Sequence, residues 1–469
     1  MGYRIEKDVL GSVRIDSKAY YGSETERARM NFQISGIRVQ DEFIRSYATL
    51  KRAAAYANMK AGKLDKKRAD AIMKAAEFVA SGNLSDQFVL DVFQAGAGTS
   101  TNMNVNEVIA NKAIEILGGK KGDYKIVHPN DHVNMSQSTN DTYHCVIRIS
   151  AYDYIGKWLI PALGNIEKSL SAKAKEFSHI YKIGRTHLQD AVPMTLGQEF
   201  HGWAGSVKHV REELSRALGS MLELPLGGTA VGTGLNTPKG YSKYAIAELN
   251  RLTGHRFKKS ANTFAAMQSE HAELEVANAL EDVAIALNRI ANDVRLLGSG
   301  PRAGLNELVL PAVQPGSSIM PGKINPSMAE MLNMVCFNVM GSMHTVREAA
   351  NSGQLELNVF MPVIAYNLLF SVKILSNGVN AFDSRCIIGI RPNKREIAKN
   401  LEMDTSLVTA LSPYIGYAKA AEIAVKAYDE GKSVKQVCIE MEIMEKGKLE
   451  KILDPKNQAN EGKKNKVGY

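Results

Sequence analysis

The sequence predicts an all-α protein dominated by a long helical bundle. In the segment 271–300, apolar residues recur at alternating steps of four and three: Val276, Leu280, Val283, Leu287, Ile290 and Val294. This heptad spacing is typical of a helix packed lengthwise against other helices. Strand patterns are scarce, and none is followed by a helix as in a βαβ unit. The predicted fold class is therefore all-α.

The remaining helices follow from composition and spacing. They are predicted at 43–62, 66–82, 197–222, 327–350 and 362–380. A further apolar seam runs from Ile155 to Leu170, and Pro161 within it predicts a kink or a helix start. Gly298 and Pro301 end the helix of 271–300. The chain of 469 residues is long enough for about three domains.

Composition and charge exclude several classes of protein. The apolar fraction of 45% and the charged fraction of 23% are ordinary for a soluble globular protein. The most apolar stretch, 359–375, is interrupted by Pro362, Asn367 and Lys373, so no membrane span is expected. The charge of +9 is spread out apart from the lysine-rich tail after Pro455, which we interpret as a solvated terminus, not a nucleic-acid site.

The predicted location is the cytoplasm. The first residues, "MGYRIEKDVLG", carry charges where a signal peptide needs an apolar centre. The four cysteines are scattered and form no CxxC pair, which favours reduced thiols over disulfides or a zinc site. His128 and His132 are four residues apart, but Pro129 argues against a helix that would align them, so no metal is expected.

Polar loops between the predicted helices are the candidate sites of chemistry. No glycine-rich loop ends in GK[ST], and "GSGPRAG" follows a helix instead of a strand, so nucleotide fingerprints are absent. What remains is a set of hydrogen-bond donors and cations that suits a small polycarboxylate. Its members are Thr99, Ser138, Thr139, Asn140, Thr186, His187, Lys323 and Asn325.

The loop 315–326, "PGSSIMPGKINP", is too rich in proline and glycine for a regular helix or strand. Ser317 and Ser318 follow Gly316, and Lys323 lies a few residues further on. A flexible catalytic lid and a rigid connection between helices both fit this composition. From the residues alone the two interpretations stay open.

Further motifs accompany this loop along the chain. They include "GAGTSTNMNVNEVIANKA", "HVNMSQSTND", "GRTHLQDAVPMTLGQEF", "GGTAVGTGLN", "SGPRAGL" and "GQLELNVF". Together with "GSSIMPGKINP" they resemble the aspartase/fumarase superfamily, from residue 3 as far as residue 455. The resemblance implies a homotetramer of nearly all-helical, three-domain subunits around a central bundle of twenty helices. Each active site would be assembled from three subunits, and the domains would be 1–140, 141–395 and 396–469.

The resemblance also implies roles for individual residues. Ser317 would be the general base that removes the C3 proton of the substrate, and Lys323 and Asn325 would hold a substrate carboxylate. Glu330 matches a glutamate that in fumarases orients the histidine corresponding to the catalytic His187. The other implied substrate contacts are Thr99, Ser138, Thr139, Asn140, Thr186, Ser318 and Met320. No cofactor is implied, because proton abstraction and loss of a leaving group need no redox carrier.

The motifs are divided between two members of the superfamily. "GAGTS", "NMSQSTND" and "GPRAGLNE" are similar to aspartate ammonia-lyases, with Ala97 and Thr139 in place of fumarase serines nearest the substrate. "HPND", "ELNVF" and the segment "SLVTALSPYIGYAKAAEIA" are similar to fumarases. Giving more weight to positions near the substrate, we predict deamination of L-aspartate to fumarate and ammonia. The alternative is a class II fumarase that interconverts fumarate and L-malate.

A few positions depart from both patterns. Glu24 stands where glutamine is usual, His144 and Cys145 where Pro-Thr is usual, and Tyr414 where histidine is common. These departures leave room for another amino or hydroxy acid as substrate. A remote alternative is a helical oligomer without catalytic activity.

Overall fold

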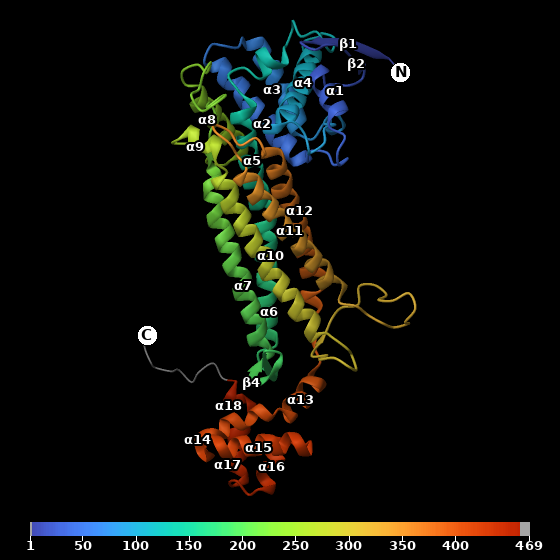
Figure 1. The fold of residues 1–469 in the computed structure, drawn as a ribbon, viewed down its shortest axis with the longest axis vertical. Helices are drawn as coiled ribbons and strands as arrows, with labels where there is room; N and C mark the ends of the chain where they lie inside the picture. Colours follow the sequence, from blue (N-terminus) through green and yellow to red (C-terminus); the bar gives the residue numbers. More distant parts are fainter. Residues whose placement is uncertain (1, 460–469) are drawn as a thin grey trace. The chain divides into compact units, whose positions relative to one another are not determined.

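The computed structural model describes residues 2–459, which form two compact units interleaved along the chain. Unit 1 comprises Met1–Pro161, Glu212–Ala284 and Phe337–Ser376, and unit 2 comprises Ala162–Arg211, Ile285–Cys336 and Asn377–Tyr469. Helices dominate both units, which confirms the predicted all-α class (Figure 1). The division into three domains stays a prediction, and the tail beyond residue 459 lies outside the described residues.

The helices of unit 1 and those it shares with unit 2 come first along the chain. They are α1 (Ser23–Asn31), α2 (Asp41–Lys60), α3 (Lys66–Ala80), α4 (Thr99–Ile116), α5 (Thr139–Tyr154), α6 (Ile160–Glu176), α7 (Leu196–Ala217), α8 (Tyr241–Thr253), α9 (Thr263–Gln268), α10 (His271–Leu297), α11 (Ser327–Asn351) and α12 (Met361–Arg385). Unit 2 adds α13 (Lys394–Met403), α14 (Ser412–Ile415), α15 (Tyr417–Glu430), α16 (Val434–Glu440), α17 (Lys446–Leu453) and α18 (Pro455–Gln458).

Short strands and tight helical turns complete the described chain. The strands are β1 (Tyr3–Asp8), β2 (Gly11–Asp16), β3 (Tyr181–Thr186), β4 (Gln189–Thr195), β5 (Glu223–Leu224), β6 (Lys258–Lys259), β7 (Leu308–Val309) and β8 (Arg391–Pro392). They pair only two at a time, β1 with β2 and β3 with β4 as antiparallel hairpins. The 3₁₀ and π turns are η1 (Ser85–Gln87), η2 (Gly96–Gly98), η3 (Pro129–Val133), η4 (Ile155–Leu159), η5 (Leu218–Leu222), η6 (Ile387–Gly389) and η7 (Thr405–Leu411).

The predicted helices are present, with small differences at their ends. The heptad residues of α10, from Val276 to Val294, are all fully buried, and α10 ends at Leu297, just before Gly298. The π turn η4 lies just before Pro161, and α6 begins directly after it at Ile160. A π turn widens the helix by one residue, which accommodates the proline without a break.

In unit 1, α2 packs against α3, α5 and α8. An aromatic group of Phe43, Tyr47 and Tyr143 joins α2 to α5, and each of these side chains is at most 1% exposed. Alanines in the "AAAYA" stretch of α2 are also buried, so neighbouring helices approach closely. This packing fixes the start of α5, where several candidate site residues lie.

In unit 2, the helices after Asn393 gather around an apolar core of their own (Figure 1). Its fully buried members include Leu411, Ile423, Val437 and Leu449, and Ile183 of β3 packs into the same core. Helix α13 contacts β3, so the hairpin β3–β4 is supported from the C-terminal helices.

One described helical stretch, 361–389, has the length and composition of a membrane span. In the structure 67% of its apolar window is buried, which is typical of a core helix.

Candidate active site

The serine loop, residues 315–326, is held by bonds within itself. The backbone N–H of Gly316 donates to the carbonyl of Lys323 at 2.8 Å, and the amide of Asn325 donates to the carbonyl of Gly316 at 2.7 Å. The loop is neither helix nor strand, as its composition predicts. Ile319, at 83% exposed, and Ser318 lie at its surface, while Ser317 is half-buried.

The hydroxyl of Ser317 accepts hydrogen bonds from two backbone N–H groups of its own loop. Those of Ile319 and Met320 lie 3.2 and 3.0 Å from Ser317 Oγ. Two donors aimed at one oxygen favour its negatively charged form over its neutral form. The loop therefore supplies what a serine needs to act as a base, namely stabilisation of its alkoxide.

The starts of α4 and α5 bring together the candidate residues of unit 1. Thr99 is the exposed first residue of α4, and the preceding turn η2 packs against α5. Ser138 caps α5 by accepting from Asn140 N at 3.2 Å, and its own N–H donates to Asp141 at 2.9 Å. Helix starts carry unpaired N–H groups and positive dipole ends, which favour an anion such as a carboxylate.

The loop 225–240 is anchored to the same end of α5. Asp141, fully buried, accepts from the N–H groups of Gly227 at 2.8 Å and Thr229 at 3.2 Å. The amide of Asn140 donates to the carbonyl of Ala230 at 2.8 Å. Burial raises the pKa of Asp141 to about 6, against the lowering effect of these hydrogen bonds. The side-chain amide of Asn140, which was predicted to contact substrate, thus also anchors the loop 225–240.

Lys51 is a buried cation that the sequence analysis missed. Its ammonium group donates to the side-chain oxygens of Asn102, Asn134 and Gln137, at 2.8, 2.8 and 2.9 Å. Complete burial lowers the pKa of Lys51 to about 7. Lys51, which lies on α2, thereby links the segment 134–137 to α2 and to Asn102 of α4. No local pattern marks it, because its partners come from distant parts of the chain.

Thr186 and His187 lie at the exposed tip of the hairpin β3–β4 in unit 2. His187 and Leu188 form its two-residue turn, with φ of 55° and 58°. Turns of this kind usually contain asparagine or glycine, and other residues there store about 1 kcal/mol or more of strain each. The turn therefore presents the imidazole of His187 to solvent at a conformational cost.

Buried ion pairs anchor the hairpin β3–β4 to other segments of unit 2. Lys182, 1% exposed, lies 2.9 Å from Glu199 and 3.0 Å from Glu307. Arg185 lies 2.7 Å from the other oxygen of Glu307. Glu307 belongs to the "GPRAGLNE" motif, so two of the sequence motifs meet here.

Glu330 is half-buried in the first turn of α11. Within the described chain, no hydrogen bond or ion pair joins Glu330 to His187. The implied orientation of His187 by Glu330 stays a prediction. Lys323 and Met320 are exposed on the serine loop, where their side chains are accessible.

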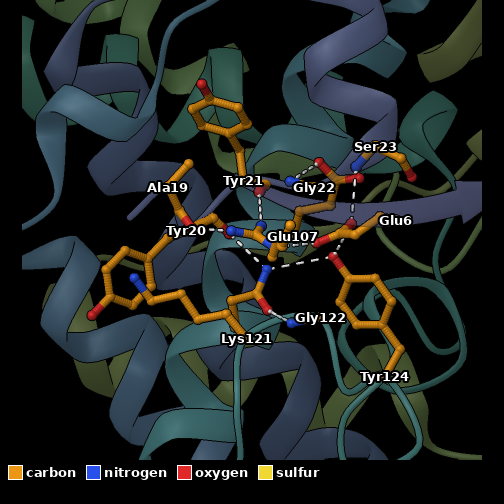
Figure 2. Close-up of polar contacts among 12 residues, drawn as sticks. Glu6, Ala19, Tyr20, Tyr21, Gly22, Ser23, Glu107, Lys121, Gly122 and Tyr124 are labelled. Atoms are coloured by element: carbon orange, nitrogen blue, oxygen red, sulfur yellow. Dashed lines mark hydrogen bonds and ion pairs between the residues drawn. The ribbon is translucent and has the colours of Figure 1, made fainter. Parts of the chain in front are cut away.

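The start of α1, in the "YYGSET" segment, is fixed by a buried carboxylate of α4 (Figure 2). Glu107 accepts from the N–H groups of Gly22, Glu24 and Thr25 and from the Thr25 hydroxyl. Burial raises the pKa of Glu107 to about 7. Glu6 joins this group by accepting from Tyr124 at 2.8 Å, as Figure 2 shows. The unusual Glu24 is thereby positioned through its backbone.

The residues that favoured aspartate over malate prove to be buried. Ala97 is 5% exposed and its N–H donates to the carbonyl of Val359 at 2.7 Å. Thr139 is 7% exposed, inside the capped first turn of α5. Both residues are packed within their own subunit, and their contact with a substrate stays a prediction.

The chain was compared with known proteins. A family model described as "Lyase" matches residues 11–341, and one described as "Fumarase C C-terminus" matches residues 407–459. The class II fumarate hydratase of Thermosynechococcus vestitus is 47% identical over 93% of this chain and 94% of its own length. The mitochondrial fumarate hydratase of Homo sapiens is 46% identical over 97% of this chain and 89% of its own length.

Solved structures agree with these relatives. A recombinant class II fumarase from Schistosoma mansoni superposes with a TM-score of 0.94 at 37% identity. The superposition covers 98% of this chain and 99% of the other.

Proposed function

The chain belongs to the aspartase/fumarase superfamily of lyases, and we propose that it is a class II fumarate hydratase, which interconverts fumarate and L-malate. The relatives carry the name fumarate hydratase at 46–47% identity over nearly the whole chain. They support the fumarase alternative better than the prediction of an aspartate ammonia-lyase.

The observation that carries the mechanism is the pair of N–H donors on Ser317 Oγ. With its alkoxide stabilised, Ser317 takes the proton from C3 of L-malate. The electron pair of that C–H bond moves into the adjacent carboxylate and forms a dianionic enediolate. The C2–O bond then breaks, the double bond of fumarate forms, and the hydroxyl leaves as water after gaining a proton.

Cations and donors would stabilise the negative charge that develops on the substrate. We assign Lys323 to the carboxylate next to C3, because its ammonium group is exposed on the same loop as Ser317. Asn325 donates one N–H to the carbonyl of Gly316, and we assign its second N–H to the same substrate carboxylate. His187 is the proposed proton donor to the leaving hydroxyl, since its imidazole is exposed at the tip of the hairpin.

The remaining substrate contacts are proposed at the starts of α4 and α5, through Thr99, Ser138 and Asn140, and at Thr186. We propose a homotetramer in which three subunits contribute to each site, because the resemblance implies that arrangement. The cytoplasmic location stays a prediction.

A serine substitution tests the proposed base. Ser317→Ala is expected to lower kcat for malate dehydration by about 10²–10⁴-fold or more, while the protein stays folded and assembled. Ser384→Ala is the matched control, because Ser384 is an exposed helical serine that bonds only to a backbone carbonyl. Equal kcat in Ser317→Ala and wild type would remove Ser317 from the mechanism.

A further inference from the structure

Unit 1 contains a buried group of ionisable side chains that the proposed reaction does not use. His144 lies on α5, and Glu270 and Glu273 lie at the start of α10. All are at most 2% exposed. One ligand atom from each lies within 4.8 Å of the others, the only such group of potential metal ligands among residues 2–459.

The hydrogen bonding of His144 determines which ring nitrogen carries the proton. Its Nε2 lies 3.1 Å from the carbonyl oxygen of Met267, which can only accept. Nε2 must therefore be protonated, and in the neutral ring Nδ1 presents a lone pair. That lone pair faces Oε2 of Glu270 at 3.4 Å.

Neither side of this facing pair has another partner. Nδ1 of His144 and both carboxylate oxygens of Glu270 are buried without a hydrogen bond from the described residues. A buried carboxylate with neither a hydrogen-bond donor nor a positive charge beside it is unfavourable. A proton shared by the two groups, or a metal ion bound by both, would satisfy this arrangement.

The separation favours a metal ion over a shared proton. A charge-assisted hydrogen bond would draw the two atoms to about 2.7–2.9 Å. Nitrogen and oxygen ligands at about 2.0–2.2 Å from a tetrahedral ion are about 3.3–3.5 Å apart. The 3.4 Å between Nδ1 and Oε2 agrees with the second arrangement.

The surroundings provide the outer contacts that metal ligands usually have. The carbonyl of Met267 accepts a hydrogen bond from the ring of His144. The guanidinium group of Arg148 donates to the two carboxylate oxygens of Glu273 at 2.8 and 3.3 Å. Arg148 also donates to the backbone carbonyl of Glu223 at 2.7 Å. A divalent ion would neutralise both carboxylates, and the remaining positive charge would lie on Arg148, which also donates to the carbonyls of Glu223 and Ala266.

We propose that His144 Nδ1, Glu270 and Glu273 bind a divalent transition-metal ion of the zinc type. The ion links α5, at a point one turn beyond Asn140, to the start of α10. Its role is structural. The sequence analysis expected no metal and considered only His128 and His132. The new ligands are distant in sequence, so spacing does not reveal them.

The test uses the full-length protein and cobalt, which reports tetrahedral coordination through visible absorption. Co²⁺ is supplied in the growth medium and, separately, during refolding, and the metal content per chain is measured after dialysis. The expected result is one Co²⁺ per chain with a tetrahedral spectrum. His144→Ala and Glu270→Gln should both lose it. His255→Ala should retain it, because it removes a comparable histidine–carboxylate pair, His255–Asp153 at 2.9 Å.

Two results would overturn the proposal. Wild-type protein without bound cobalt by either route would mean that a proton occupies the space between His144 and Glu270. Cobalt retained equally by His144→Ala and Glu270→Gln would place the ion elsewhere. If His144→Ala does not fold, the wild-type stoichiometry and Glu270→Gln, which preserves the size of the side chain, still decide the question.

Discussion

The side-chain amide of Asn325 donates to the carbonyl oxygen of Gly316 across 2.7 Å. Together with the bond from Gly316 N to the carbonyl of Lys323 at 2.8 Å, it closes the serine loop on itself. Ser317 lies directly after Gly316, so this closure determines where its hydroxyl and its two N–H donors are held. The proposed base is therefore positioned by bonds inside its own loop.

Gly316→Ala should disrupt this closure. A Cβ at residue 316 would lie 2.4 Å from the carbonyl oxygen of Lys323 and 2.9 Å from the N of Asn325, both backbone atoms. We expect kcat/KM for malate to fall about 100-fold, since a displacement of 1 Å costs that much in oriented catalysis. Tm should change little, because the loop is largely exposed. Unchanged kcat/KM would show that the closed loop is not the active conformation.

His187→Asn should separate the chemistry of His187 from its place in the turn. Asparagine adopts positive φ readily, so the hairpin should keep its geometry. Loss of the imidazole should lower kcat by about 10²–10⁴-fold. Leu188→Gly, which relaxes the neighbouring position of the turn, is the control and should retain activity. Equal kcat in His187→Asn and wild type would exclude His187 as the acid.

Lys51 should make the protein more stable as pH rises above neutrality. Its pKa is lowered to about 7 in the folded chain, while a lysine in the unfolded chain titrates at about 10.4. Between these values the unfolded state binds more protons, so the free energy of unfolding rises with pH, by at most about 1.4 kcal/mol per pH unit.

Lys51→Met should flatten this rise and lower stability overall, because the side-chain oxygens of Asn102, Asn134 and Gln137 lose their donor. The measurement is the urea midpoint at pH 7 and pH 9, at one protein concentration. Lys74→Met, at an exposed lysine of α3, should keep the wild-type slope. Parallel pH dependence in Lys51→Met and wild type would contradict the assignment.

Gly22→Ala should destabilise the start of α1. A Cβ there would lie 2.5 Å from the Tyr124 hydroxyl and 2.8 Å from Glu107, the buried carboxylate that binds this segment. Such overpacking costs about 1–3 kcal/mol. Gly219→Ala is the control, because a Cβ at residue 219 meets nothing within 4 Å. Equal Tm values for the two variants would mean that the α1 segment adjusts freely.

Much of the fold could be predicted from local sequence patterns. The heptad of α10 and the ends of α2, α3 and α11 depend on residues close together in the chain, so periodicity and capping reveal them. The irregular serine loop follows from its prolines and glycines. The hairpin under His187 was missed, because Lys182 and Arg185 anchor it to the distant Glu307.

The site was predicted less completely than the fold. Ser317 was placed correctly in an irregular loop, but its two N–H donors could not be foreseen from composition. Lys51 was missed because its partners Asn102 and Asn134 lie far along the chain. The choice of aspartate rested on Ala97 and Thr139, whereas relatives similar over nearly the whole chain favour the fumarase alternative.

Comparing kcat/KM for L-malate with kcat/KM for L-aspartate tests whether the chain hydrates fumarate. Formation of fumarate is followed by its ultraviolet absorbance, with each substrate supplied separately to the same purified protein. The account predicts fumarate from L-malate and none from L-aspartate. Fumarate from L-aspartate alone would contradict it and restore the ammonia-lyase prediction, and no fumarate from either would favour a non-catalytic oligomer or another substrate.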